Sequence, residues 1–503
     1  MTMKFNNYLT FLSILIFFLA SCQTTEQAGD QDAEAEDNQE ETFDIPDYQA
    51  LEYPELPELV SPDVTTFELD NGIKFYLLED DELPLIDVNV RVRAGSFLVP
   101  DEKTGLGSIM ASLMREGGTE NHPSDELDMF LESRGAEIET NMGTTSASAS
   151  MNVLKDDFEE VLPVFLDVMQ EPEFPYARLG QIMQQRQSQI SRRNDSQSQV
   201  TSREFQRLIY GKESLQGRMT EYETLENIDR DDLIDLHDKV FVSENLKVGV
   251  TGDFDEEEMK TLLEDKFSDF RTGDPIEIEI PEVDYEYEST INFVDKRDVD
   301  QADIRMGHIG GRRDNDDYAA LQMMNKVLSD GFSGRLFRIV RSDMGLAYSV
   351  GGNYGMNMFY DGMFFAGVQT ASENTAEAIN AVKDQIGRLQ EEEVEQEELE
   401  ETRERIMNSL VFDYETKAST LHEMMSNDYR GLPRDAYDQY IEELQEVTTE
   451  DIQRVANEYL RPEEMHILVV GHGGEIGDQL EEFGKVNEID ISIPGQPQQQ
   501  MGF

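Results

Sequence analysis

The chain has 503 residues, with 107 Asp and Glu against 41 Lys and Arg, and its formal net charge is −66 at pH 7. This length exceeds one ordinary hydrophobic core, so we expect two or more domains. Such an acidic surface repels nucleic acid and anionic lipid, which argues against a DNA- or RNA-binding function. Two interpretations of the acidity remain open. One is a surface suited to high salt, and the other is an acidic chamber that attracts basic peptides.

Residues 1–21 are typical of a bacterial lipoprotein signal peptide. Lys4 precedes a mostly apolar run at residues 8–20, which is too short to span a bilayer and suits a signal-peptide core. The run ends in LASC at positions 19–22, which resembles the lipobox, and Cys22 is the only cysteine. We therefore expect lipidation of Cys22 and anchoring in the cell envelope, at an outer membrane facing the periplasm or the surface. The alternative is an ordinary signal peptide with an incidental cysteine.

Residues 22–60 are polar and acidic, and we predict that they form a disordered tether. The folded part then begins with a predicted hairpin that turns at residues 70–72, where the sequence is Asp-Asn-Gly. Apolar residues alternate with polar ones at residues 88–93 and again at 147–153, as in half-buried strands. Between these strands the sequence predicts a helix that opens at residues 123–126 and is closed by Gly135.

Two pairs of segments repeat along the chain. Residues 228–252 and 447–471 align without a gap at an offset of 219 residues, from Gly252 to Gly471. Each copy predicts a capped helix followed by an apolar strand. Residues 103–118 and 317–332 also align as helices at an offset of 214 residues, from Gly117 to Gly331. Two matches at nearly equal offsets favour a duplicated domain of about 200 residues.

The repeat predicts an α+β fold with two homologous half-domains, each an antiparallel sheet covered by helices. We place the N-terminal half-domain at residues 61–280 and the C-terminal one at 281–490, with a tail at 491–503. The join is expected near the acidic stretch at residues 274–288.

From about residue 63 to about 485 the chain resembles the insulinase/pitrilysin peptidase family, in a bacterial branch similar to the mitochondrial processing peptidase. The most specific segment is GFSGRLFRIVRSDMGLAYSV, at residues 331–350. Gln301 before a predicted strand and the run at residues 118–139 are also similar to the family. The resemblance implies two homologous α+β halves that form one half of a clam shell around a peptide.

In active members the resemblance implies a first-half helix with the motif His-x-x-Glu-His, whose two His bind zinc while the Glu activates water. Here the flanking residues place Ser108, Ala111 and Ser112 at the His, Glu and His positions. The third zinc ligand of the family, a glutamate, falls near Gln189. Neutral Ser and Gln oxygens are poor zinc ligands, and Ala111 accepts no proton. We therefore expect no metal in this chain.

The six histidines offer no second zinc motif. None has another His or a suitable Glu at the required spacing, and Ser426 stands where His422-Glu423 would need a second His. We expect His308 to be structural, and His466 and His472, which flank an apolar strand, to be structural or exposed. The remaining two are His122 and His237.

The second-half motif is retained as Arg341 and Tyr348. By resemblance, these residues reach over a zinc site, hold the substrate backbone and stabilise the oxyanion of the tetrahedral intermediate. The structural alternative is that Arg341 caps a helix and Tyr348 packs in a strand. Residues 333–335 (Ser333, Gly334 and Arg335) precede the helix and are weaker candidates for shaping the pocket.

A chain that keeps one half of an active site is expected to be the non-zinc subunit of a heterodimeric metallopeptidase. It would be inactive alone and would pair with a homologous chain that carries His-x-x-Glu-His and the zinc. The alternative is a non-catalytic peptide-binding or scaffold lipoprotein of the same fold. No cofactor motif or nucleophile constellation supports an unrelated enzyme.

Overall fold

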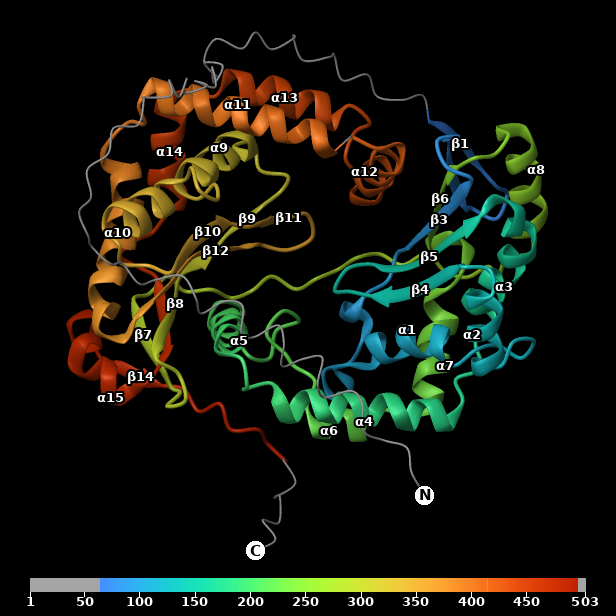
Figure 1. The fold of residues 1–503 in the computed structure, drawn as a ribbon, viewed down its shortest axis with the longest axis horizontal. Coiled ribbons are helices and arrows are strands. Elements are labelled where there is room, and N and C mark those ends of the chain that lie inside the picture. The colour runs from blue at the N-terminus through green and yellow to red at the C-terminus, as the bar shows by residue number, and fades with distance from the viewer. Residues whose placement is uncertain (1–63, 414, 496–503) are drawn as a thin grey trace, which may run out of the picture. The chain divides into compact units, whose positions relative to one another are not determined.

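The structure is a computed structural model that describes residues 64–413 and 415–495, without the side chains of Val411 and Asp413. The predicted signal peptide, Cys22 and the tether lie outside the described residues, as does the end of the tail. Two six-stranded, mostly antiparallel sheets with helices packed on them make up the described chain (Figure 1). This confirms the predicted α+β fold class.

The first sheet has the strand order β1-β2-β6-β3-β5-β4. Its strands are β1 (Thr65–Glu68), β2 (Lys74–Glu79), β3 (Leu85–Val92), β4 (Glu137–Met142), β5 (Ala147–Leu154) and β6 (Leu246–Gly252). The helices of this part of the sequence are α1 (Leu106–Glu116), α2 (Ser124–Glu132), α3 (Phe158–Gln170), α4 (Tyr176–Arg192), α5 (Gln197–Tyr210), α6 (Tyr222–Glu226), α7 (Arg230–Val240) and α8 (Glu256–Phe267).

The predicted early elements are confirmed. β1 and β2 pair as an antiparallel hairpin, and Gly72 adopts a φ of 87° at its turn, where a side chain would be strained. β3 buries every second residue, as its alternating pattern predicted, and β5 does the same. The predicted helix is α2, which ends at Glu132. Gly135, with a φ of 59°, therefore lies in the turn before β4 and not directly at the helix end.

The second sheet has the order β10-β12-β8-β13-β7-β14. Its strands are β7 (Thr290–Asp295), β8 (Gln301–Ile309), β10 (Ser349–Tyr354), β12 (Met363–Ala371), β13 (His466–Gly471) and β14 (Val486–Glu488), and β9 (Gly311–Arg312) pairs separately with β11 (Met356–Asn357). The helices are α9 (Tyr318–Leu328), α10 (Thr375–Glu391), α11 (Gln396–Asp413), α12 (Lys417–Arg430), α13 (Ala436–Glu446), α14 (Thr449–Tyr459) and α15 (Gly473–Ile476).

Short helices connect these elements. The 3₁₀ helices are η2 (Ser96–Leu98), η3 (Asp101–Lys103), η4 (Lys155–Asp157), η5 (Ser243–Asn245), η7 (Ser372–Asn374) and η8 (Gly477–Phe483). A π-helix, η6, spans Leu336–Asp343.

The two sheets repeat one strand order. The first reads β2-β6-β3-β5-β4 and the second reads β7-β13-β8-β12-β10, with the same parallel and antiparallel pairs in sequence. The repeated segments form α7 with β6 and α14 with β13, as predicted. Only the outer strands differ, because β1 is antiparallel to β2 whereas β14 is parallel to β7. No helix or strand is present between Phe267 and Thr290, where the join was predicted.

One helix from each half of the sequence packs against the sheet of the other half. α5 contacts β8 and β13, and its Val200, Phe205 and Ile209 share an apolar cluster with strands of the second sheet. Conversely, α12 contacts β2, β3 and β6 of the first sheet (Figure 1). This exchange joins the two halves, and the sequence did not predict it.

The contact of α12 with the first sheet combines close packing with an ionic cluster. Leu421 and Met425 pack on Tyr76, and a Cβ at Gly249 of β6 would overlap the Met425 sulfur. Asp428 accepts hydrogen bonds from Tyr76, Lys247 and Lys74, the last at 3.1 Å from Nζ. Burial alone would raise the pKa of Asp428, but these hydrogen bonds outweigh it and lower the pKa to about 2.

Candidate functional site

Helix α1 carries the three positions at which the family has its zinc motif. Ala111 is buried in the core, and the Ser108 hydroxyl donates to the carbonyl of Gly105 in its own helix at 3.0 Å. α1 packs against α4, the helix that carries Gln189. The structure therefore brings together α1 and α4, the two helices that carry the zinc ligands in active members of the family. At the aligned positions of this chain, neither helix carries a zinc-ligand side chain.

The guanidinium of Arg186 bridges two of these positions. Its Nη2 donates to Ser112 Oγ at 3.3 Å, and its Nη1 donates to Gln189 Oε1 at 3.2 Å. A fixed positive charge thus stands between the residues that replace the second and third zinc ligands. Sequence reasoning missed Arg186, although it lies three residues before Gln189 and so on the same helix face.

These residues do not fit a zinc ion. Two neutral hydroxyls, an amide and an alanine offer no imidazole or carboxylate ligand, and a guanidinium repels a divalent cation at this distance. Within the part of the chain that the structure describes, no group of three His, Cys, Asp or Glu side chains is placed to hold a metal ion.

His308 is fully buried on β8 and has both ring nitrogens satisfied. Nδ1 donates to the Ile309 carbonyl at 2.6 Å, and Nε2 accepts from the Arg461 backbone N–H at 3.1 Å, which assigns the tautomer. Burial lowers the pKa of His308 to about 4. This confirms the predicted structural role. His466 binds Thr290 Oγ1 at 2.6 Å, and His472 caps α15, so both are also structural.

We predict that His308 makes the stability of the protein depend on pH. Its pKa is about 4 when folded, against 6.5 for an ordinary histidine, so protons bind the unfolded chain more tightly. The neutral ring contributes its full stability above pH 6.5, and up to about 3 kcal/mol of this is lost as the pH falls towards 4. In urea unfolding at several pH values, His308→Gln should flatten the decline in unfolding free energy across this window. In the matched variant His472→Gln, the unfolding free energy should decline with falling pH as in the unsubstituted chain. The same decline in His308→Gln would contradict the prediction.

Arg341 lies on the π-helix η6, which is anchored by the buried Leu336 and Val340. Its guanidinium carbon lies 4.4 Å from the centre of the Phe337 ring, one turn earlier. The expected ordinary helix is thus a π-helix, a form frequent at functional sites. Arg341 stands in the last turn of η6 but makes no side-chain hydrogen bond with a described residue, so it does not cap the helix through such a bond.

Tyr348 directly precedes the edge strand β10 and is 71% exposed. Its backbone N–H donates to the Gln369 carbonyl at 2.8 Å, which fixes the main chain while the ring faces solvent. The alternative that Tyr348 packs in a strand is therefore wrong. Phe332 and Met344 of the same segment are also exposed, and the rings of Phe332 and Phe337 meet edge to face at 4.8 Å.

The turn before η6 is held rigidly. Arg335 donates to both oxygens of Glu398 on α11, at 3.1 and 2.6 Å, and a Cβ at Gly334 would overlap the backbone of Asp330. Arg335 therefore anchors the turn through an ion pair. Ser333 lies in the same turn and is exposed.

An open cavity of about 560 Å³ lies along β10. Its lining includes Ser349, Gly351 and Gly352 of the edge strand, Phe365 of β12 and Ser198 of α5. The N–H groups of Gly352 and Tyr354 already donate to Ser329 Oγ at 2.7 Å and to Asn325 Oδ1 at 2.9 Å, so only the start of this edge strand is open to an extended peptide. No hydrogen bond or ion pair between described residues links Arg341 or Tyr348 to the degenerate positions on α1 and α4.

Two family profiles match the chain and together cover more than half of it. "Insulinase (Peptidase family M16)" matches residues 76–220, and "Peptidase M16 inactive domain" matches residues 227–406. An "Uncharacterized zinc protease" of Rickettsia bellii is 23% identical over 72% of this chain and 86% of its own length. The "Non-peptidase homolog YmxG" of Helicobacter pylori is 22% identical over 74% of this chain and 86% of its own.

Solved structures share the fold. A peptidase M16 inactive domain from Pseudomonas fluorescens has a TM-score of 0.74 at 21% identity, covering 82% of this chain and 98% of that one. A protease from Helicobacter pylori has a TM-score of 0.70 at 17% identity, covering 82% of this chain and all of the other.

Proposed function

Because this chain belongs to the insulinase family of peptidases (family M16), we propose that it is the non-zinc subunit of a heterodimeric metallopeptidase. The observation that carries this proposal is that the chain keeps the second-half residues of the family's active site and lacks the first-half zinc ligands. Arg341 and Tyr348 are presented on an anchored, exposed segment, whereas the first-half positions Ser108, Ala111, Ser112 and Gln189 hold no ligand.

In this role Arg341 and Tyr348 contact the substrate in the zinc site of the partner chain. A guanidinium and a phenol are hydrogen-bond donors, and donors that are already in place stabilise the negative charge that develops on the scissile carbonyl oxygen. The stack of Arg341 on Phe337 and the buried residues of η6 support such preorganisation. The exposed Phe332 and Met344 suit a surface that is covered in a complex.

The substrate we propose is an unfolded peptide. The start of the edge strand β10 and the cavity beside it suit a short extended stretch of backbone that adds to the sheet. The zinc, and with it the activation of water, is assigned to the partner, a homologous chain that carries His-x-x-Glu-His.

We also propose that the protein is a lipoprotein of the cell envelope, anchored by acyl chains on Cys22. The support is the signal peptide and lipobox in the sequence. Within the described residues, no helix has both the length and the apolar character needed to cross a bilayer.

A non-catalytic scaffold is the second candidate. The loss of every family ligand in the first half favours it, because a scaffold has no need of zinc. The exposed Tyr348, with the half-buried Arg341 on the same segment and free of any ion pair with a described residue, favours the catalytic subunit, because a scaffold has no need of either group.

The decisive experiment compares the purified chain, the homologous zinc-bearing chain from the same genome and their mixture. We expect bound zinc and cleavage of an unfolded peptide to be absent from this chain alone, and the cleavage rate of the partner to rise strongly on mixing. Assembly without any change in rate would favour the scaffold. Hydrolysis by this chain alone with one equivalent of zinc would overturn the proposal.

A further inference from the structure

Four arginines gather around helix α12. Arg91 lies on β3, Arg93 directly follows it, Arg313 follows β9, and Arg430 ends α12. Arg91 contacts α12 through Ser426 Oγ at 3.2 Å and His422 Nε2 at 3.4 Å. Because both first-sheet and second-sheet elements contribute, the cluster exists only through the exchange of α12 between the halves.

None of these four guanidiniums forms an ion pair with a described carboxylate. Arg91 and Arg93 instead lie over the Tyr429 ring, each at 5.3 Å from its centre. Arg313 stacks at 3.3 Å over Tyr318, and the Arg430 side chain makes no hydrogen bond with a described residue. In a chain with a net charge of −66, where acids outnumber bases, four such arginines at one place need a separate explanation.

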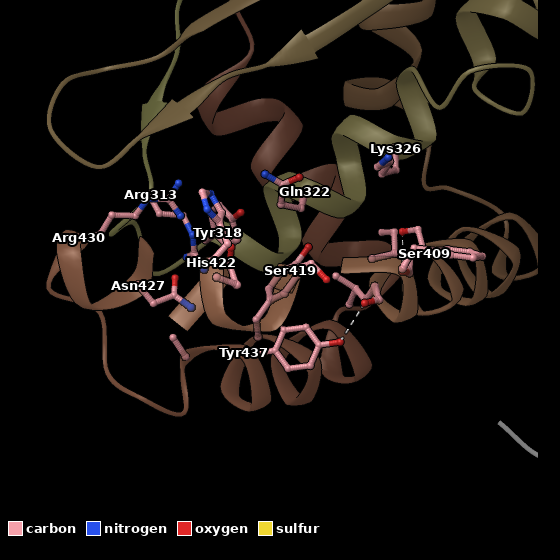
Figure 2. Close-up of a pocket in the computed structure, with 16 residues that line it drawn as sticks. Arg313, Tyr318, Gln322, Lys326, Ser409, Ser419, His422, Asn427, Arg430 and Tyr437 are labelled. Carbon is pink, nitrogen blue, oxygen red and sulfur yellow. Dashed lines mark hydrogen bonds between the residues drawn. The ribbon is translucent and has the colours of Figure 1, made fainter. Parts of the chain in front are cut away.

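A cavity of about 690 Å³ opens beside this cluster, between α9, α11, α12 and α13. Figure 2 shows Arg313, His422, Asn427 and Arg430 towards one end of the cavity and Lys326 towards the other. Glu423 is the only carboxylate among the lining residues, and Lys326 is paired with Asp330 at 3.1 Å. Arg313 and Arg430 are therefore the cationic lining residues without an ion pair, and they outnumber the single lining carboxylate, Glu423.

The electrostatics of the cluster agree with a missing anion. Burial lowers the pKa of Arg91, and the charge of Arg430 lowers it further, against opposing effects of Tyr429 and Glu423. Burial likewise lowers the pKa of His422, with Arg91 and Arg430 adding to the effect and Glu423 opposing it. Like charges held together raise the free energy of the folded chain, and a bound carboxylate would remove this repulsion.

The walls of the cavity define what else the ligand carries. Ile406, Leu410 and the exposed Phe412 line it, together with the ring of Tyr318. A cavity that is lined by both apolar side chains and two guanidiniums fits a ligand with an apolar body and an anionic head. The planar guanidinium matches a carboxylate with two parallel hydrogen bonds.

We propose that this cavity binds the C-terminal carboxylate of a peptide whose last residue is apolar. Arg313 and Arg430 hold the carboxylate, and the side chain of the last residue rests against Ile406 and Leu410. The site goes beyond the proposed peptidase role and needs no partner chain, so it can be tested on this protein alone.

The test measures the anisotropy of an N-terminally labelled hexapeptide that ends in phenylalanine, in its free-acid and C-terminal amide forms, with the full chain at low salt. We expect the acid to bind at least 10-fold more tightly than the amide. Arg430→Ala should lower the affinity for the free-acid peptide to that for the amide peptide. Arg313→Lys should lower the affinity for the free-acid peptide by a smaller factor, because a lysine lacks the planar fork of the guanidinium. Arg434→Ala is the matched control, since this exposed arginine follows α12 without lining the cavity.

Four outcomes would overturn the proposal. The first is equal binding of acid and amide, and the second is unchanged acid binding in Arg430→Ala when its thermal unfolding matches that of Arg434→Ala. The third is displacement of the acid by inorganic phosphate at concentrations where acetate has no effect, which would assign the cluster to phosphate. The fourth outcome concerns a C-terminal amide peptide that contains an internal glutamate. If it matches the acid, the cluster recognises side-chain carboxylates and the C-terminal assignment is wrong.

Discussion

Arg341→Ala is expected to lower peptide hydrolysis by the assembled heterodimer at least 100-fold, without loss of assembly. Removal of one preorganised donor from an oxyanion site typically costs a factor of about 100 to 1,000, or about 3 to 4 kcal/mol of transition-state stabilisation. The side chain stacks on Phe337 and anchors nothing else in the described chain, so the fold should tolerate its removal. The effect should appear in kcat more than in KM, because the charge develops only in the transition state.

The matched control is Arg338→Ala on the same π-helix. Arg338 is also an arginine, but it pairs with Glu398 at 3.2 Å, and its side chain is 51% exposed. We expect this variant to keep the rate of the unsubstituted complex. Tyr348→Phe, which removes only the phenol hydroxyl, should reduce kcat in the same direction as Arg341→Ala. If the double variant Arg341→Ala with Tyr348→Phe assembles and remains fully active, the second half contributes no chemistry and the scaffold interpretation holds.

Restoring the family motif should restore only weak zinc binding while Arg186 is present. The variant would carry Ser108→His, Ala111→Glu, Ser112→His and Gln189→Glu. With Arg186 retained, we expect zinc to bind about 100-fold more weakly than after a further Arg186→Met change. A guanidinium about 4 Å from a cation opposes it by about 4 kcal/mol per unit charge near a protein surface, and movement of the side chain relieves part of this. A 100-fold difference corresponds to about 3 kcal/mol.

Chelator competition on the two variants measures this difference directly. Arg192→Met in the same background is the control, because Arg192 is exposed at the end of α4 and bonds to neither Ser112 nor Gln189. Equal zinc affinity with and without Arg186 would show that its guanidinium does not guard the site. Both backgrounds must first show the same cooperative unfolding transition, since His and Glu introduced at positions 108 and 111 enlarge side chains beside the core.

Local sequence patterns predicted much of the fold, because they report which side of an element is buried. The alternation along β3 and β5, the turn at Gly72 and the repeated α7–β6 and α14–β13 units all follow from period and turn chemistry. The resemblance to the family located the degenerate zinc motif on α1 and identified Tyr348, which the structure shows to be exposed. It did not predict the π-helix η6, since no periodic signal separates a π-helix from an α-helix over eight residues.

The sequence by itself determined the α+β class, the repeat, the absence of zinc ligands at the motif and the retention of Arg341 and Tyr348. The tertiary structure alone decided how distant segments meet. The exchange of α5 and α12 depends on which apolar faces cover which sheet, and the lack of room for a Cβ at Gly249 beside Met425 shows how closely they fit. The bridge from Arg186 to Ser112 and the arginines around α12 arise from such contacts. Sequence separation carries no information about them, because a long side chain finds its partners only after the helices have packed.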